Sequence, residues 1–78
     1  MVVGPPAVFA FVSCPSGQVA LGGGGLPSGT GAHNPLTTSI PTTNGGGSNT
    51  GDLANGWFAT AGIGGGNYQA YVICAPTT

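Results

Sequence analysis

The stretch that decides the fold of this chain is SCPSGQVALGGGG, residues 13–25. Cys14 stands where an apolar segment ends. The Pro-Ser-Gly sequence that follows it predicts a tight turn, because Pro fixes φ and Gly accepts a positive φ. We expect residues 18–21 to form a short strand that pairs back on the segment before the turn, and the glycines of 22–25 to end that strand. These glycines fit a bulge, a close crossing of the backbone, or a loop packed beneath the tryptophan.

The only other cysteine, Cys74, ends the last apolar segment, residues 68–74. Like Cys14, it lies on the small-residue face of a predicted strand. A disulfide between the two would close most of the chain and stabilise the fold by about 4 kcal/mol in the loop-entropy model. The alternatives are two buried free thiols or a metal site, although two cysteines and one distant histidine fall short of a structural zinc set. We predict the disulfide, which implies an oxidising final environment.

The composition is that of a small, loop-rich β-domain. Of 78 residues, 17 are Gly and 7 are Pro, yet 40% are hydrophobic and fall in short blocks that a disordered chain lacks. A core of this size is marginal without further stabilisation. No segment shows helical periodicity over a useful length. The sequence therefore predicts an all-β fold: a single-domain sandwich or barrel of four to six short antiparallel strands, with glycine-rich loops and one disulfide.

The expected organisation begins with an extended arm at residues 1–6, where two consecutive prolines forbid helix. The β-domain covers residues 7–75, and residues 76–78 form a tail. The Gly/Thr/Asn-rich segment 42–51 is expected to be a long exposed loop that is either functional or mobile. Strands are expected within 7–13, 18–21, 36–40, 55–62 and 68–74, with a tight glycine turn at 64–67.

The charge count argues against several classes of function. The chain has no Lys, no Arg, one acid (Asp52) and one histidine (His33). Lys and Arg supply most of the affinity for phosphates, so we expect no binding to nucleic acid and none to an anionic membrane. No apolar run is long enough to insert into a bilayer. A small protein with so little charge has poor colloidal stability, which favours a subunit of a larger assembly.

Catalysis is also disfavoured. A hydrolytic triad would need His33, Asp52 and a serine, but no Gly-x-Ser-x-Gly elbow is present and both groups lie in loops that hold geometry loosely. The glycine runs lack the Lys-Ser/Thr of a phosphate-binding loop. We expect Asp52 to cap a turn, and His33 to be a solvated loop residue or a subunit contact. The sequence thus predicts no enzyme, no cofactor and no metal, with calcium on Asp52, Asn49 and Asn55 as a remote alternative.

Two apolar blocks are candidates for contact with other subunits. The segment 7–13 is apolar on both faces, so it is either wrapped by its own fold or buried against a neighbour. Together with the block after residue 56 it gives a predicted subunit interface of Val8, Phe9, Phe11, Trp57 and Phe58. As an alternative, an aromatic platform for a surface glycan would consist of Trp57, Tyr68 and Tyr71. Core packing or burial between subunits is favoured for these rings, because no Arg, Asp or Glu stands beside them to fix hydroxyl groups.

Several of these residues together resemble a known domain. The motifs are Cys14-Pro15-x-Gly17 followed by the glycines of 22–24, then Gly56-Trp57, then Tyr71-x-x-Cys74-Ala75. They look like a small β-rich domain found on phage virion proteins and on bacterial secreted or surface proteins, sometimes after collagen-like repeats. The resemblance covers roughly residues 12–75 and implies an exterior location. This chain departs from the pattern because it has no collagen-like stretch and no partner domain.

These observations predict a non-enzymatic structural subunit on the exterior of a particle, above all a phage capsid decoration or minor virion protein at the virion surface. Its expected partners are copies of itself and/or a major capsid or filament subunit. The alternatives are an extracellular bacterial filament or surface subunit, and a secreted module that binds a carbohydrate or receptor. Met1 is followed by no basic leader, so we expect either a mature chain to which a Met was added, or a protein made in a cytoplasm that reaches the outside by another route, as virion components released by lysis do.

Overall fold

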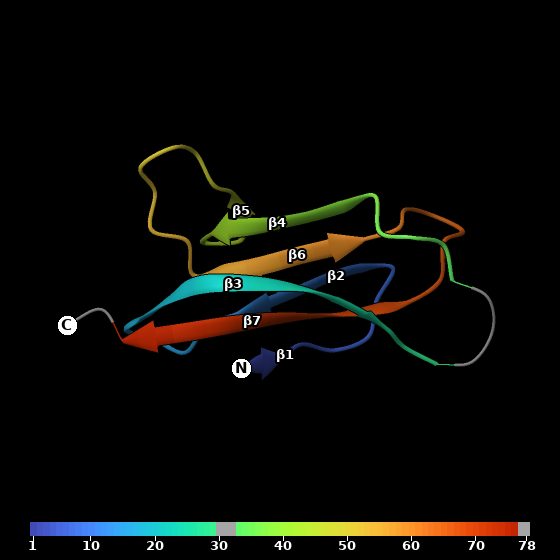
Figure 1. The fold of residues 1–78 in the computed structure, drawn as a ribbon, viewed down its shortest axis with the longest axis horizontal. Helices are drawn as coiled ribbons and strands as arrows, with labels where there is room; N and C mark the ends of the chain where they lie inside the picture. Colours follow the sequence, from blue (N-terminus) through green and yellow to red (C-terminus); the bar gives the residue numbers. More distant parts are fainter. Residues whose placement is uncertain (30–32, 77–78) are drawn as a thin grey trace.

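The structure is a computed structural model that describes residues 1–29 and 33–76. Within these residues the protein is all-β, and its strands form two antiparallel sheets (Figure 1). The strands are β1 (Val2–Val3), β2 (Phe9–Ser13), β3 (Gln18–Pro27), β4 (Thr38–Thr43), β5 (Gly46–Gly47), β6 (Gly56–Thr60) and β7 (Tyr68–Pro76). The predicted class, the antiparallel pairing and the small sandwich are confirmed. The described part has more strands than expected because β1 and β5 each add a two-residue strand.

Sheet A has the strand order β1-β7-β3, so the last strand of the chain lies at its centre. The arm expected at 1–6 is extended, and its first residues form β1, in which Val2 lies opposite Val72. Gly4 continues the pairing by donating from its N–H to the carbonyl of Ala70 at 2.8 Å. At the other end, Pro76 completes β7, while the tail residues 77–78 lie outside the described residues.

The course of β3 differs from the prediction in two ways. The strand does not end at residue 21 but continues through the glycines to Pro27, with a register shift between Ala20 and Gly22. It also pairs with β7 rather than with β2, so the chain crosses from one sheet to the other at the Pro-Ser-Gly turn. The physical reason is that glycines carry no side chain, which lets β3 lie face to face against β6 at close range.

Sheet B has the strand order β2-β6-β4-β5. β4 begins and ends later than the expected strand at 36–40, and its last two residues pair with β5. The turn between them is Asn44-Gly45, where both residues have positive φ, 51° and 87°. This is the two-residue hairpin turn that Asn-Gly favours. The segment 42–51 therefore starts as a hairpin, and it is not a structureless loop throughout.

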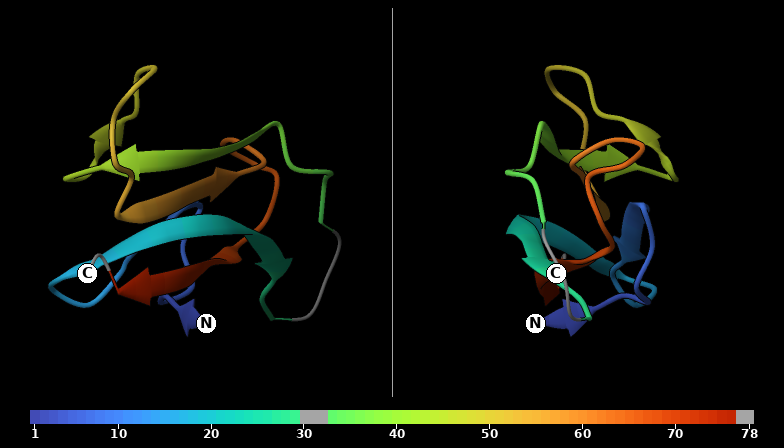
Figure 2. Two further views of the ribbon diagram at one scale, coloured as in Figure 1. Left: turned by 60° about the vertical axis from the view of Figure 1, so that its left-hand side comes forward. Right: turned by 90° about the vertical axis from the view of Figure 1, so that its right-hand side faces the viewer.

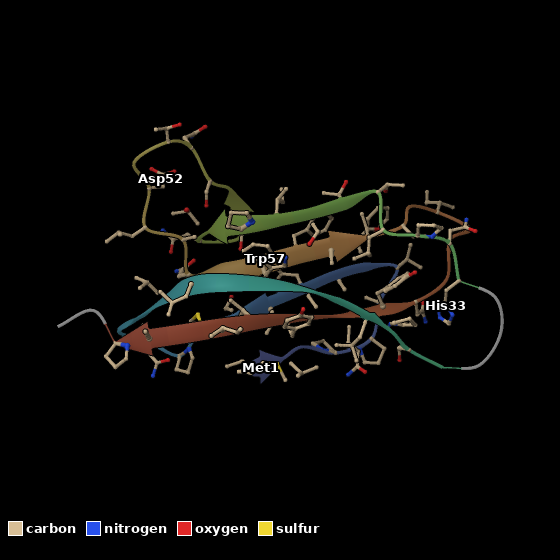
Figure 3. The ribbon with its side chains drawn as sticks, in the orientation of Figure 1. Met1, His33, Asp52 and Trp57 are labelled. Carbon is tan, nitrogen blue, oxygen red and sulfur yellow. A yellow bond between two sulfur atoms is a disulfide. The ribbon has the colours of Figure 1, made fainter. Side chains whose placement is uncertain are left out.

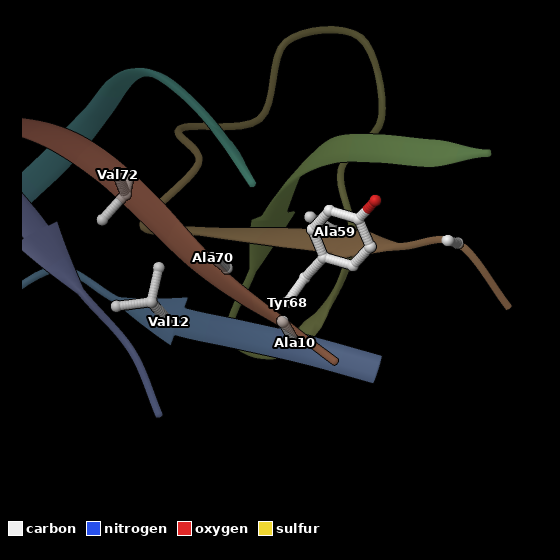
Figure 4. Close-up of a cluster of buried hydrophobic side chains, with 7 residues drawn as sticks. Ala10, Val12, Ala59, Tyr68, Ala70 and Val72 are labelled. Carbon is white, nitrogen blue, oxygen red and sulfur yellow. The ribbon is translucent and has the colours of Figure 1, made fainter. Parts of the chain in front are cut away.

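The core between the sheets is built mostly from small side chains (Figure 4). Its buried apolar residues are Ala10, Val12, Ala59, Ala61, Tyr68, Ala70 and Val72. Small residues permit the sheets to approach closely, and this is clearest where β3 crosses β6. A Cβ placed on Gly23 would lie 2.5 Å from Cδ2 of Trp57, and one on Gly25 would lie 2.8 Å from Cβ of Ala59. Figure 2 shows the resulting two layers from the side and from one end.

The predicted disulfide is present. Cys14, directly after β2, is bonded to Cys74 in β7, with their Cα atoms 6.0 Å apart. The bond therefore joins sheet B to sheet A, and so ties the two layers of the sandwich together. It closes a loop with a sequence separation of 60 residues. A loop of that length corresponds to about 4 kcal/mol in the chain-entropy model, a large contribution for a domain with so small a core.

Candidate functional site

The outer side of sheet B carries an apolar surface that no part of the described chain covers. We call it the aromatic face and define it by Phe9, Phe11, Ile40 and Phe58. Phe58 of β6 lies opposite Phe11 of β2 on one side and opposite Ile40 of β4 on the other. The rings of Phe9 and Phe58 are stacked, with centroids 6.5 Å apart and an interplanar angle of 6°. Phe9 is 52% exposed and Ile40 is 41% exposed.

The alternation of β2 explains how these rings come to face outward. Along Phe9–Ser13 the residues are alternately exposed and buried, so Ala10 and Val12 enter the core. The phenylalanines point the other way because successive side chains of a strand lie on opposite faces. The larger apolar residues are therefore outside and the smaller ones inside. A sheet face that meets water usually carries polar residues instead.

The aromatic face carries no charge. The chain has no Lys or Arg, and its one acid lies in the loop after β5. Two nearby polar groups, Thr42 of β4 and Thr60 of β6, are buried. The Thr60 hydroxyl donates to the Val8 carbonyl at 2.7 Å and accepts from the Gly62 N–H at 2.8 Å. The Thr42 hydroxyl has no hydrogen-bond partner within the described residues. The surface thus offers a partner apolar contact and almost no polar recognition.

The five residues of the predicted interface are not all on this face. Phe9, Phe11 and Phe58 are brought together, whereas Trp57 lies on the opposite side of β6, with its indole beneath Gly23. Val8 is partly buried just before β2, where its carbonyl accepts the hydrogen bond from Thr60. Trp57 and Phe58 are both large and apolar, so only the register of β6 decides which of them points inward.

Two apolar features were not anticipated from the sequence. Ile40 completes the aromatic face, although its alternation with Ser39 in the strand pattern was a usable signal. The outer side of sheet A is apolar as well, with Val3, Tyr71 and Ile73 along β1 and β7. Its one amide side chain, Gln69, donates to the Gly4 carbonyl at 3.1 Å. Both outer sides of the sandwich are therefore largely apolar.

The three rings of the alternative glycan platform do not converge. Tyr68 is 4% exposed, and its hydroxyl donates to the Asn34 carbonyl inside the fold. Tyr71 lies on the outer side of sheet A, where its ring covers Gly24. Trp57 lies between β6 and β3, and its Nε1–H donates to the Ser39 hydroxyl at 3.0 Å. No shared surface presents these rings to one ligand.

His33 and Asp52 lie at opposite ends of the molecule (Figure 3). The Asp52 carboxylate accepts from the Asn49 N–H at 2.8 Å, and the Asp52 N–H donates to the Asn49 carbonyl at 3.0 Å. The expected turn-capping role of Asp52 is thus confirmed. His33 packs edge-on against Tyr68, with ring centroids 5.4 Å apart, and its Nε2 lies 3.0 Å from the Ser28 carbonyl oxygen.

Other kinds of site are absent from residues 1–29 and 33–76. No three His, Cys, Asp or Glu side chains gather there, and no pocket is enclosed. In the same residues there is no helix that is long and apolar enough to span a membrane. Comparison with known proteins finds no matching family model, no matching curated protein and no matching solved structure.

Proposed function

We propose that this protein is a non-enzymatic structural subunit that docks on the exterior of a particle, and that the particle is a phage virion bearing it as a capsid decoration or minor virion protein. The observation that carries the proposal is the aromatic face: three phenylalanines and an isoleucine on the outer side of sheet B, without a charged group. Contiguous exposed apolar surface of this kind marks an interaction site in soluble proteins.

The chemistry of the face defines the partner. Burying a Phe side chain fully contributes about 1.5–3 kcal/mol, so stacked Phe9 and Phe58 favour contact with another apolar surface. A partner that presented charges here would lose their hydration and gain no counter-charge, since this chain has no Lys or Arg and a single acid. The partner surface is therefore uncharged. Copies of this chain, or a major capsid or filament subunit with an apolar patch, fit that requirement.

The disulfide supports an exterior setting. Disulfides persist in oxidising surroundings and are rare in a reducing cytosol, and the Cys14–Cys74 bond ties the two sheets together. The same observation favours the second candidate, an extracellular bacterial filament or surface subunit, which would use the same face. The glycan-binding alternative has no such support, because Trp57, Tyr68 and Tyr71 lie apart.

A matched pair of variants tests the aromatic face. Phe9→Ser removes an exposed ring of the face, and Ile63→Ser removes an apolar side chain that is 90% exposed in the turn after β6. We expect reversible self-association of the purified protein in analytical ultracentrifugation, weakened about tenfold by Phe9→Ser because a large part of one ring's burial is lost. Ile63→Ser leaves association unchanged. Equal effects of both changes contradict docking through this face, and a protein that stays monomeric at every concentration rules out copies of this chain as the partner.

Immunogold electron microscopy tests the location. Antibodies raised against the purified chain are applied to the particles released by cells that encode it. Gold on capsids supports the virion proposal, and gold on filaments or the cell surface supports the second candidate. If no exterior particle or surface is labelled while the chain is present in the lysate, both are refuted.

A further inference from the structure

We infer that β3 is a peptide-binding edge: the N–H and C=O groups of Gly23 and Gly25 pair with an extended polypeptide strand that has no charged side chains and joins sheet A beside β3. Adding a strand to an exposed sheet edge is a common mode of peptide recognition, in which backbone hydrogen bonds supply much of the affinity. This edge is separate from the aromatic face, so the inference goes beyond the proposed function and does not depend on it.

The hydrogen bonds of β7 show which way the peptide groups of β3 point. In an antiparallel sheet, successive residues direct their N–H and C=O to opposite sides. The Ala70 carbonyl accepts from the Gly4 N–H, so Ala70 faces β1. Its neighbour Tyr71 therefore faces β3, where its partner is Gly24. By the same alternation, Gly23 and Gly25 direct their N–H and C=O away from β7, and among the described strands β3 pairs with β7 alone.

The open part of this edge has defined ends. At one end the Ala20 N–H donates to the Ala54 carbonyl at 2.8 Å, so the loop before β6 covers the edge there. At the other end stands Pro27, opposite Tyr68, which exchanges both of its backbone hydrogen bonds with Ala7. Pro27 therefore faces the open side, where its missing N–H costs no ladder bond. Between these ends, Gly23 and Gly25 offer two donors and two acceptors at strand spacing.

Sheet B provides a surface against which a strand added beside β3 packs. Sheet A has three strands against four in sheet B, and Figure 1 shows β4 and β5 extending past β3 on the side away from β7. Ser39 and Pro41 of β4 are paired with Ala59 and Trp57, so they lie on the side of sheet B that faces sheet A. Ser39 is nevertheless exposed, and Trp57 and Pro41 are only partly buried. We call this surface next to β3 the shelf; it consists of Ser39, Pro41 and Trp57, and Leu36 packs against Gly25 at one end of it.

These features determine which kind of molecule can bind at the edge of β3. A strand backbone matches the alternating donors and acceptors of Gly23 and Gly25, and neither glycine places a side chain between the two backbones. The shelf carries no charge, so a charged strand would be desolvated without compensation. A second copy that offered its own β3 about a two-fold axis would bring β4 and β5 of both copies to the same side of the joined sheet, next to β3, which disfavours a second copy as the occupant. The fitting partner is therefore a single extended, uncharged segment.

Amide hydrogen exchange, measured by NMR, tests this edge residue by residue. The probe is a capped eight-residue peptide of alternating Thr and Val. We expect exchange at Gly23 and Gly25 to slow about tenfold once roughly nine-tenths of the protein is bound, because exchange then occurs from the free fraction. Gly22 and Gly24, whose amides face β7, are protected with or without the peptide. The same peptide carrying N-methyl groups on alternate residues is the control and gives no slowing.

Two variants complete the test. Ser39→Asp places a charge on the shelf and abolishes the protection, whereas Ile63→Asp, at an exposed turn, retains it. Phe9→Ser also retains it, which separates this edge from the aromatic face. Absence of slowing at Gly23 and Gly25 at millimolar peptide overturns the inference. So does slowing that rises with protein concentration alone, which means a second copy, or a shift of the Trp57 indole signal without amide protection, which means a side-chain site.

Discussion

Two regions of this protein are rich in glycine for different physical reasons. In β3, the glycines of 22–25 lie in a regular strand, and a Cβ on Gly23 would lie 2.5 Å from both Cδ2 of Trp57 and the Tyr71 carbonyl oxygen. In the β4–β5 hairpin, a Cβ on Gly45 or Gly47 would meet no atom within 4 Å. Gly23 is needed because there is no room for a Cβ, whereas Gly45 is needed because of its positive φ. Glycine content alone therefore does not indicate flexibility.

The β3 region is not uniform either. Gly23 and Gly25 face β6, where Trp57 and Ala59 occupy the space that side chains would fill. Gly24 faces the other way, and the Tyr71 hydroxyl would lie 2.8 Å from a Cβ placed there. An aromatic ring laid over a cross-strand glycine compensates for the missing side chain. By contrast, a Cβ on Gly22 would meet nothing within 4 Å.

The largest effect is expected from removing the disulfide, which is the covalent link between the two sheets. We expect the double variant Cys14→Ser with Cys74→Ser to lose about 4 kcal/mol in free energy of unfolding, from the loop-entropy model. Urea denaturation followed by Trp57 fluorescence measures the loss, and it reports at the β3–β6 contact itself. Reduction of the native protein is the matched experiment and gives a similar loss. A change below about 1 kcal/mol contradicts the assigned role of the disulfide.

The next largest effect on the free energy of unfolding is expected at Gly23 but not at its neighbour Gly22. Gly23→Ala forces a methyl group against the Tyr71 carbonyl, a backbone atom that cannot rotate away, so we expect a loss of about 3 kcal/mol from overpacking. Gly22→Ala, one residue earlier, has open space and a negative or extended φ, so its effect stays within about 0.5 kcal/mol. Thermal or urea denaturation of both variants measures the difference. Equal effects mean that the two sheets do not approach as closely as described.

The smallest effects are expected in the hairpin. Gly45 has φ of 87°, so Gly45→Ala costs about 1 kcal/mol through the left-handed backbone region. Gly47 has no positive φ and no neighbour within 4 Å of a Cβ, so Gly47→Ala changes the free energy of unfolding by less than about 0.5 kcal/mol. Urea denaturation ranks the two variants. If Gly47→Ala destabilises as much as Gly45→Ala, the two-residue turn at Asn44-Gly45 is misassigned.

The sequence was informative wherever local alternation or cysteine position carried the signal. The alternation of β2 separates Phe9 and Phe11 from Ala10 and Val12, and the placement of the cysteines at strand ends identifies the disulfide. The Asn44-Gly45 hairpin carried an equally clear local signal that the long-loop interpretation overlooked. These features depend on residues close together in the chain.

The features that could not be predicted depend on long-range contacts. A glycine run predicts the end of a strand when it is read locally, and only the approach of Trp57 from a strand some 30 residues away explains why β3 continues through it. Likewise, nothing local decides whether Trp57 or Phe58 enters the core. The residues of the aromatic face could thus be predicted in part. The position of Trp57 on the opposite side of β6 from this face could not.

The disulfide also determines how this domain responds to mechanical tension. A pull applied to the two ends of the chain passes through the Cys14–Cys74 bond and bypasses the strands between them. The segment between Cys14 and Cys74 cannot then be extended, because the bond holds their Cα atoms 6.0 Å apart. Strands β1 and β2 lie before the disulfide, so they are the first elements to be pulled away, β1 from β7 and β2 from β6. The contour length between the two cysteines therefore stays locked under tension for as long as the disulfide is intact.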